Sequence, residues 1–414
     1  TNSVSQSTVT APLAPVASAA TGWTTSLFAA NWAASAGATS YRLDVSTLVG
    51  FGSFVSGWEN VNVGDVTTYD VDSSLSAGSV YYFRVRAVNA AGTASTNSAV
   101  ITAYTLSTEP AGHVSSFAAA PASTSSINLT WTAAAGPPSG YIILQREGSA
   151  PTGTPTDGVG YSVGNDIGDG TVAAIVTPGS EESAPISGLD AGTAYYFVII
   201  PFAWNGANAQ TYNYRTASAP GANATTVYAE PTQASAVTFS SVGTSGMTVE
   251  WTSGNGANRI VLAHAGAVVD AHPADMNAYA ADAAFGDGAE LGTDNFVVYS
   301  GSGSSVAVSG LSADTVYHFR VYEFNGSGVT ANYNANTASG NPASRITMAT
   351  EPTENPSSAT ITAVGAGGFT ISWSGGNGAN SIVLVKAGGA VDSAPVDQAT
   401  YTANATFGSG TEIG

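Results

Sequence analysis

The sequence contains no cysteine, and Lys386 is the single lysine among its nine basic residues. Without cysteine there are no disulfide bonds and no thiolate metal sites, and the cellular compartment stays open. Against 28 acidic residues, the nine basic ones give a formal net charge of −19. Such a chain repels phosphate backbones and anionic lipid head groups, so we expect no nucleic acid partner and no binding to membrane surfaces.

Long apolar runs and charged side chains are also scarce. The longest apolar run lies near residues 195–204, well short of the roughly 20 residues that span a bilayer. We therefore expect no membrane insertion. Charged residues make up 9% of the chain, so hydroxyl and amide groups must cover most of its surface. The sequence shows no starting Met and no leader pattern, and we expect a mature form or a piece of a longer protein.

The sequence is rich in Gly, Ala, Ser and Thr, and it repeats. Its 414 residues exceed one ordinary core and fit several domains of about 100 to 150 residues each. Three Glu-Pro dipeptides recur every 121 residues, at Glu109-Pro110, Glu230-Pro231 and Glu351-Pro352. Recurrence of the same dipeptide at a fixed period predicts a tandem array of similar domains. Because proline fixes φ and extends the residue before it, each joint should be short and semi-rigid.

One segment marks each copy of the repeat. Residues 311–325 read LSADTVYHFRVYEFN, and related segments lie at 75–89 and 189–205. In each, a Leu precedes a Tyr by six residues, and alternation then begins with Tyr-x-Phe. A period of two predicts a strand with one buried face. Another alternating strand in each copy ends on a tryptophan, at Trp32, Trp131, Trp251 and Trp373.

A further segment, Pro-x-Asp-x3-Tyr, occurs in three copies and is missing from the first. Its aspartates are Asp157, Asp275 and Asp397, and a glycine follows the tyrosine at equal spacing, at Gly168, Gly286 and Gly408. We interpret the aspartate as a turn residue whose side chain bonds its own backbone two residues on. No stretch shows a sustained 3.6-residue period, so we expect almost no helix.

The tryptophan strand and the Leu-x5-Tyr-x-Phe strand together resemble the fibronectin type III domain. The resemblance covers nearly all of the chain past residue 10. It implies an all-β fold of tandem immunoglobulin-like, fibronectin type III β-sandwiches, which we expect to form an elongated rod. It also implies core positions for the four tryptophans. Tyr81, Tyr195 and Tyr317 would form the tyrosine corner, in which the phenol bonds a backbone group near the turn.

The predicted domains are a tail or linker at 1–10, three complete domains at 11–107, 108–229 and 230–349, and a partial fourth at 350–414. Compared with the third domain, the fourth lacks a Leu-x5-Tyr-x-Phe strand. A half sandwich exposes an apolar face and open strand edges. We expect either that a longer chain was cut here or that strands of a neighbouring subunit complete the domain and build a filament.

Carboxylates near glycines are the only metal candidates. Asp166 and Asp169 lie in NDIGDG, and Asp287 and Glu290 lie in GDGAELG. Calcium binds several oxygens from one flexible loop, but ordinary turn chemistry explains the same pattern. The four histidines have no chelating partner at a fixed spacing, so we expect no zinc site and no histidine-based catalysis. We expect no catalytic residue and no cofactor other than calcium.

Apolar and aromatic residues gather on the signature strand of the second domain and in the loop after it. Exposed aromatic rings stack on sugars or anchor protein partners. We weigh a contact with a protein partner, a second copy or a glycan against the alternative that a long loop packs onto its own sandwich. The residues concerned are Tyr196, Ile200, Phe202, Trp204, Tyr212 and Tyr214.

These expectations point to architecture, and not to chemistry. The resemblance implies a non-catalytic structural or adhesive repeat region, a stalk or filament, of a secreted or cell-surface bacterial protein. Its place would then be extracellular. Two alternatives stay open: the spacer region of a secreted carbohydrate-active enzyme, and a module that binds sugar or protein through the aromatic residues of the second domain.

Overall fold

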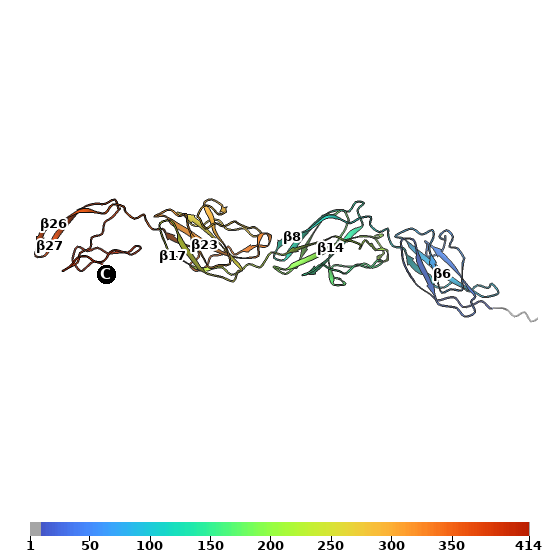
Figure 1. The fold of residues 1–414 in the computed structure, drawn as a ribbon. Helices are drawn as coiled ribbons and strands as arrows, with labels where there is room; N and C mark the ends of the chain where they lie inside the picture. The colour runs from blue at the N-terminus through green and yellow to red at the C-terminus, as the bar shows by residue number, and fades with distance from the viewer. Residues whose placement is uncertain (1–9, 414) are drawn as a thin grey trace, which may run out of the picture. The chain divides into compact units, whose positions relative to one another are not determined.

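The computed structural model describes residues 10–413, so the predicted tail at 1–10 lies outside it apart from Thr10. As predicted, the described chain is nearly all β (Figure 1). Its helical parts are two 3₁₀ turns, η1 (Ala209–Thr211) and η2 (Gly328–Thr330). None of the helices described is long and apolar enough to pass through a bilayer. The chain divides into two compact units, Thr1–Tyr228 and Ala229–Gly414.

The first sandwich has a three-stranded sheet, β1-β2-β5, and a four-stranded sheet, β4-β3-β6-β7. Along β6 (Val80–Val88) every second side chain is buried, as the alternation of Tyr81 and Phe83 predicts. The buried side chains of the two sheets meet in one core around Trp32. The other strands are β1 (Ala17–Thr21), β2 (Phe28–Trp32), β3 (Ser40–Ser46), β4 (Val61–Gly64), β5 (Thr68–Val71) and β7 (Ile101–Tyr104).

The second sandwich pairs a sheet β13-β9-β8 with a larger sheet β11-β12-β10-β14-β15, in which β16 also pairs β14. Both sheets are antiparallel throughout. The signature segment is β14, an interior strand of the larger sheet between β10 on one side and β15 and β16 on the other. The strands are β8 (Ser115–Ser123), β9 (Ser126–Thr132), β10 (Gly140–Glu147), β11 (Asp166–Ile167), β12 (Gly170–Val176), β13 (Ser183–Ser187), β14 (Ala194–Ala203), β15 (Asn213–Tyr214) and β16 (Gly221–Thr225).

The third sandwich repeats this arrangement, with sheets β17-β18-β22 and β20-β21-β19-β23-β24, and β25 paired to β23. The same order of strands follows from the same order of sequence signals. The strands are β17 (Ser235–Ser240), β18 (Met247–Thr252), β19 (Asn258–Ala265), β20 (Glu290–Leu291), β21 (Asn295–Gly301), β22 (Ser305–Val308), β23 (Val316–Asn325), β24 (Asn332–Tyr333) and β25 (Ala343–Ile346).

Tryptophans and tyrosines take the places that the resemblance implies. Trp32, Trp131 and Trp251 are 4%, 4% and 5% exposed in the cores of the three sandwiches. Each corner tyrosine accepts a hydrogen bond from a backbone N–H five residues upstream, at 2.7 Å for Tyr81, 3.0 Å for Tyr195 and 2.9 Å for Tyr317. These bonds fix the turn that leads into each signature strand.

The second and third sandwiches each contain a second apolar cluster, on the outer face of the larger sheet. In the second sandwich it joins Ile142, Ile200 and Phe202 to residues of the insert such as Ile167. In the third, Tyr322 and Leu291 take part in the matching cluster. The insert therefore covers a sheet face that would otherwise meet water. The first sandwich lacks the insert, and there Arg84 and Arg86 hold a buried Asp44.

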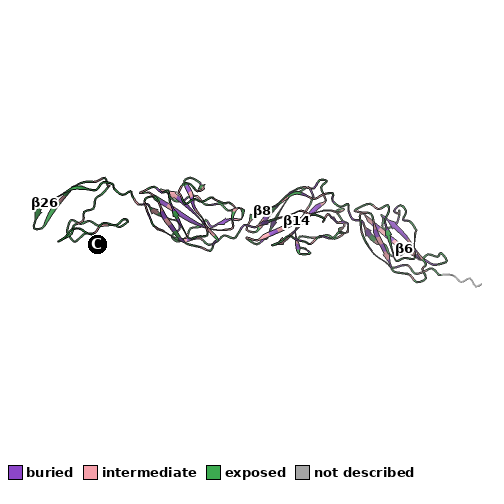
Figure 2. Cartoon of the chain, in the orientation of Figure 1, coloured by how far each residue is buried: buried purple, intermediate pink, exposed green. Residues whose placement is uncertain are grey.

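Residues 351–413 contain one strand pair among the described residues, β26 (Ser357–Gly365) with β27 (Gly368–Ser374). Figure 2 colours most residues here as exposed, whereas each sandwich contains many residues coloured as buried. Trp373 is 42% exposed, although the matching Trp251 is 5% exposed. The cause is the lack of a facing sheet, as the missing Leu-x5-Tyr-x-Phe signal predicts.

Candidate binding surface

The insert of each larger sandwich is held by its aspartate. Asp157 Oδ1 accepts a hydrogen bond from the N–H of Tyr214 at 2.8 Å, and Asp275 Oδ1 accepts one from Tyr333 at 2.8 Å. We predicted that this carboxylate bonds its own backbone two residues on, and that is wrong. The partner lies more than fifty residues away because β15 and β24 come back alongside the insert in the fold.

The glycine spacing in the insert does not mark equivalent positions. Gly168 directly follows β11, and in the third sandwich the residue that follows the matching strand β20 is Gly292. Both have a left-handed backbone, with φ of 62° and 68°. Gly286 precedes β20 instead. The equal spacing to Gly168, Gly286 and Gly408 is therefore not a structural match, because the segment before β20 differs in length.

The six predicted partner-contact residues divide into two groups. Ile200, Phe202 and Tyr214 are 1%, 1% and 4% exposed, because the insert and its own sandwich cover them. For these three the prediction of a partner contact is wrong, and for Tyr214 the alternative, packing onto its own sandwich, is correct. The other three are partly exposed and stay candidates for a partner contact: Tyr196, Trp204 and Tyr212.

Trp204 and Tyr212 form a stacked pair, with ring centroids 5.0 Å apart and planes inclined by 14°. Tyr212 also stacks on Tyr214, at 5.5 Å and 7°. Burial raises the pKa of the Tyr212 phenol. The third sandwich has Gly326 and Ala331 at the matching places. The Trp204–Tyr212 pair is thus specific to the second sandwich. The neighbouring ring pair, Phe202 with Tyr214, has a counterpart in the third sandwich, Phe324 with Tyr333.

Three of the four carboxylates considered for calcium, Asp166, Asp169 and Glu290, accept hydrogen bonds from nearby groups. Asp169 accepts hydrogen bonds from the N–H and hydroxyl of Thr152 and an ion pair from Arg146 at 2.7 Å. The two bonds from Thr152 are the main reason that the pKa of Asp169 falls to about 2. Asp166 Oδ1 accepts from the Thr171 hydroxyl at 2.9 Å.

In the third sandwich, Glu290 Oε1 accepts a hydrogen bond from the N–H of Asp294 at 2.8 Å. Glu290 stands at the same place in its strand as Asp166, since β20 matches β11, whereas Asp287 lies in the segment before β20. The four candidates thus do not share one loop geometry. Within residues 10–413, groups of three or more His, Asp and Glu side chains that could hold a metal do not occur.

Two of the histidines meet in a way that sequence spacing did not reveal. His264 and His318 are direct cross-strand partners between β19 and β23. His264 Nδ1 lies 2.8 Å from the carbonyl oxygen of Ala265, and His272 Nδ1 lies 3.0 Å from the phenol of Tyr322. Burial and the nearby charge of Arg320 lower the pKa of His272. The pairing of His264 with His318 depends on the register of β19 against β23, and the spacing of the histidines in the sequence does not determine that register.

A buried ion pair is the second feature that the sequence analysis missed. Arg259 Nε donates to Glu323 Oε1 at 2.7 Å, with side chains 9% and 0% exposed. The same carboxylate accepts from the N–H of Gly254 at 2.8 Å and of Gly256 at 3.0 Å. It therefore holds the Asn-Gly turn between β18 and β19. At the matching pair of the second sandwich stand Tyr141 and Pro201, which carry no charge.

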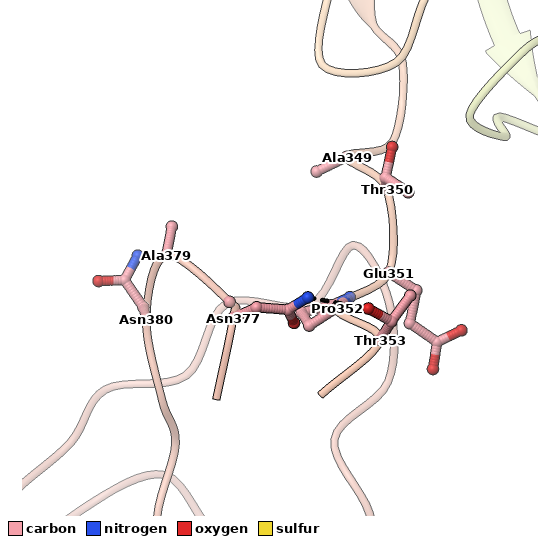
Figure 3. Close-up of a pocket in the computed structure, with 9 residues that line it drawn as sticks. Ala349, Thr350, Glu351, Pro352, Thr353, Asn377, Ala379 and Asn380 are labelled. Atoms are coloured by element: carbon pink, nitrogen blue, oxygen red, sulfur yellow. Dashed lines mark hydrogen bonds between the residues drawn. The ribbon is translucent and has the colours of Figure 1, made fainter. Parts of the chain in front are cut away.

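An open hollow of about 480 Å³ lies beside the third Glu-Pro dipeptide (Figure 3). Its walls are residues 349–353 and the turn at 377–380, and Glu351 is the one ionisable side chain among them. Asn377 Oδ1 accepts from the N–H of Glu354, and its Nδ2 donates to the Thr353 hydroxyl. One carboxylate is not enough for acid–base catalysis by a pair of groups. The asparagine instead holds residues 353–354 against the turn at 377–380.

Comparison with known proteins gives structural likeness at low sequence identity. Neither a known family nor a curated protein matches the sequence. The FN1–FN3 domains of chicken CNTN1 are 15% identical, over 82% of this chain and 100% of theirs, with a TM-score of 0.32. A segment of two fibronectin type III domains from chicken tenascin is 14% identical over 54% of this chain and 98% of its own length, with a TM-score of 0.22.

A β-1,2-glucanase from Parabacteroides distasonis is 21% identical over 25% of this chain and 14% of its own length, with a TM-score of 0.20. The fold is defined by the chain's own strand order. A three-stranded sheet faces a larger sheet in each sandwich, and the signature strand is an interior strand of the larger one. With buried tryptophans and three tyrosine corners, the chain is a tandem array of fibronectin type III-like β-sandwiches.

Proposed function

We propose that this chain is a non-catalytic structural repeat region, a stalk or filament, of an exported bacterial protein at the cell surface. The observation that carries the proposal is the way in which the first two Glu-Pro dipeptides are anchored to the sandwich that follows each of them. Arg215 donates to the carbonyl of Pro110 at 3.2 Å and pairs with Glu109 at 3.1 Å. Asn334 donates to the carbonyl of Pro231 at 2.7 Å.

Anchored joints suit a load-bearing role because they fix each linker to the sandwich that follows it, which shortens the free length of the linker. The anchoring residues follow β15 and β24, so the same hairpin that closes each insert also grips the linker before its own sandwich. A chain built to present separate, freely moving modules would have no need of these bonds. The acidic, cysteine-free composition is compatible with an exported protein that stays apart from its neighbours.

Labelling of intact cells tests this proposal. An antibody raised against the 414-residue protein is expected to label unpermeabilised source cells and to lose its signal after surface proteolysis. Labelling that requires permeabilisation would show that the protein acts inside the cell. Assays on a panel of polysaccharides should show no turnover by this chain, and turnover that survives repurification would support an enzyme instead.

A second candidate function is binding of sugar or protein through Trp204 and Tyr212. The observation that favours it is that the stacked pair occurs in the second sandwich and has no counterpart in the third. A stacked aromatic platform suits the apolar face of a sugar ring. A glycan array with wild type and Trp204→Ala is the test. Binding that depends on Trp204 would support this function, and the same profile for both proteins would exclude it.

A further inference from the structure

The insert of the second sandwich meets the end of the first sandwich at one residue. Gly158, directly after Asp157, has φ of +75°, and a Cβ placed there would lie 3.0 Å from Cε3 of Trp23. Trp23 follows β1 and packs edge-on against Tyr104 within its own sandwich. The tryptophan ring thus occupies the space that any side chain at Gly158 would need. Both residues belong to the same compact unit.

The insert after the third sandwich meets that sandwich at the corresponding residue. Gln398, directly after Asp397, accepts a hydrogen bond from Arg345 at 2.7 Å through its Oε1. Its Nε2 lies 3.4 Å from the carbonyl oxygen of Val242. These residues again share one compact unit.

The two contacts use equivalent positions on both sides. Trp23 and Val242 each follow a left-handed residue after the first strand of their sandwich, Gly22 at φ 64° and Ser241 at φ 48°. Each also stands nine residues before the core tryptophan of its sandwich. On the other side, Gly158 and Gln398 each follow the aspartate of the insert. The contacts at these two joints thus use the same two positions of the repeat, one on each side.

The backbone at the insert position is left-handed in every copy, whatever the residue. Met276 has φ of 63° and Gln398 has φ of 64°, close to the 75° of Gly158. Side chains rarely adopt this conformation unless the surrounding structure imposes it, and such strain gathers at functional positions. The structure imposes it here by gripping the residue, since the N–H of Gly158 donates to Tyr212 and that of Met276 donates to Ala331, both at 2.9 Å.

Further bonds close the first joint around this contact. Ser107 donates its N–H to Thr211 at 2.9 Å, and its carbonyl accepts from Asn213 Nδ2 at 2.7 Å. Asn205 Nδ2 donates to the carbonyl of Gly78 at 3.1 Å. All three partners in the second sandwich lie on the segment that runs from the end of β14 to the first residue of β15. This segment also holds Gly158, so the joint and the insert form one connected surface.

We propose that the residue after the insert aspartate is the position with which a sandwich recognises the sandwich before it. Its partner is the turn after the first strand of that preceding sandwich. At the first joint, Gly158 has no side chain and so leaves room for the bulky ring of Trp23. At the other joint, where Val242 replaces the tryptophan, the longer Gln398 reaches across to a carbonyl and to Arg345. The residue pair therefore sets which sandwiches can stand next to each other.

Distances between two spin labels in the full chain test this proposal, and the lack of native cysteine makes labelling clean. Thr102→Cys and Thr130→Cys place nitroxides on exposed strand positions of the first and second sandwiches. We expect Gly158→Met to widen the distance distribution, because the new side chain displaces the Trp23 ring. Gly164→Met is the matched control, since Gly164 has φ of +89° with open space around it. It carries the same backbone strain and should leave the distribution unchanged.

A double variant shows whether the effect passes through the ring. Trp23→Ala should widen the distribution, and adding Gly158→Met to it should widen it no further. Equal distributions for Gly158→Met and Gly164→Met would overturn the proposal. So would a Met effect that persists without the ring. If Gly158→Met fails to fold by circular dichroism, Trp23→Ala carries the test alone, and an unchanged distribution then refutes the proposal.

Discussion

Neutralising Glu323 should destabilise the third sandwich far more than a surface substitution would. Its carboxylate is fully buried and accepts three hydrogen bonds, from Arg259, Gly254 and Gly256. Glu323→Gln keeps the size of the side chain but removes the charge that faces the guanidinium. It also places an amide N–H₂ where a backbone N–H now donates. Arg259, 9% exposed, is left with an uncompensated charge.

The magnitude follows from burial. Removing one partner of a buried ion pair costs about 3–5 kcal/mol, because the other charge stays desolvated without its counterion. Exposed pairs are worth roughly 0–1 kcal/mol. Arg146→Ala, which breaks the half-exposed pair with Asp169, should therefore have little effect on the second sandwich. For a sandwich of this size, the larger loss corresponds to a fall of roughly 10–20 °C in melting temperature.

Hydrogen exchange read by mass spectrometry measures the stability of each sandwich separately. The slowest amides of β19 and β23 report complete opening of the third sandwich. For Glu323→Gln their protection should fall roughly 100- to several-thousand-fold, while amides of β10 and β14 keep theirs. The double variant Arg259→Met with Glu323→Leu should regain part of the loss, because an apolar pair removes both buried charges but leaves the N–H groups of Gly254 and Gly256 without their acceptor. A fall of less than tenfold in the single variant, or no recovery in the double one, would refute the reasoning.

Three further predictions follow from single contacts. Tyr317→Phe removes the corner hydrogen bond of 2.9 Å and should lower the stability of the third sandwich by about 1–2 kcal/mol in the same exchange experiment. The pKa of Asp169 lies below its usual value of 3.8, at about 2, so its stabilising contacts are complete above pH 4 or so and vanish as pH falls through about 2. The amide shift of Thr152 should therefore titrate near pH 2, and a midpoint near 4 would contradict this. Trp373→Phe should shift tryptophan emission to shorter wavelength, because Trp373 is 42% exposed; an unchanged maximum would show that it is covered.

The strands and cores could be predicted because they depend on local patterns. Alternation along the signature segments fixed the buried face of β6, β14 and β23, and the tryptophan register located the facing sheet. A tyrosine corner needs a Leu and a Tyr six residues apart, and this spacing can be read directly from the sequence. These features involve residues close in sequence or faces with a period of two, so residue order alone determines them.

The role of the insert could not be predicted, because its partners are distant in sequence. Ile200 and Phe202 looked like a free apolar face, since alternation shows that a side chain leaves the sheet but not what covers it. The covering residues, among them Ile167, precede β14 by some thirty residues and carry no strong pattern of their own. The contact between Asp157 and Tyr214 is hidden for the same reason.

The buried ion pair shows where comparison of the repeats reaches its limit. Arg259 and Glu323 are cross-strand neighbours, and so are Tyr141 and Pro201 in the second sandwich. The same place in the fold is thus filled once by opposite charges and once by an uncharged pair. Replacing only one residue of either pair by its counterpart in the other sandwich would leave a buried charge without its counterion. Aligned one at a time, Arg259 and Glu323 look like exposed strand residues that vary between copies. Only the register of β19 against β23 shows that they change together, and this is why a charge at one of them requires the other.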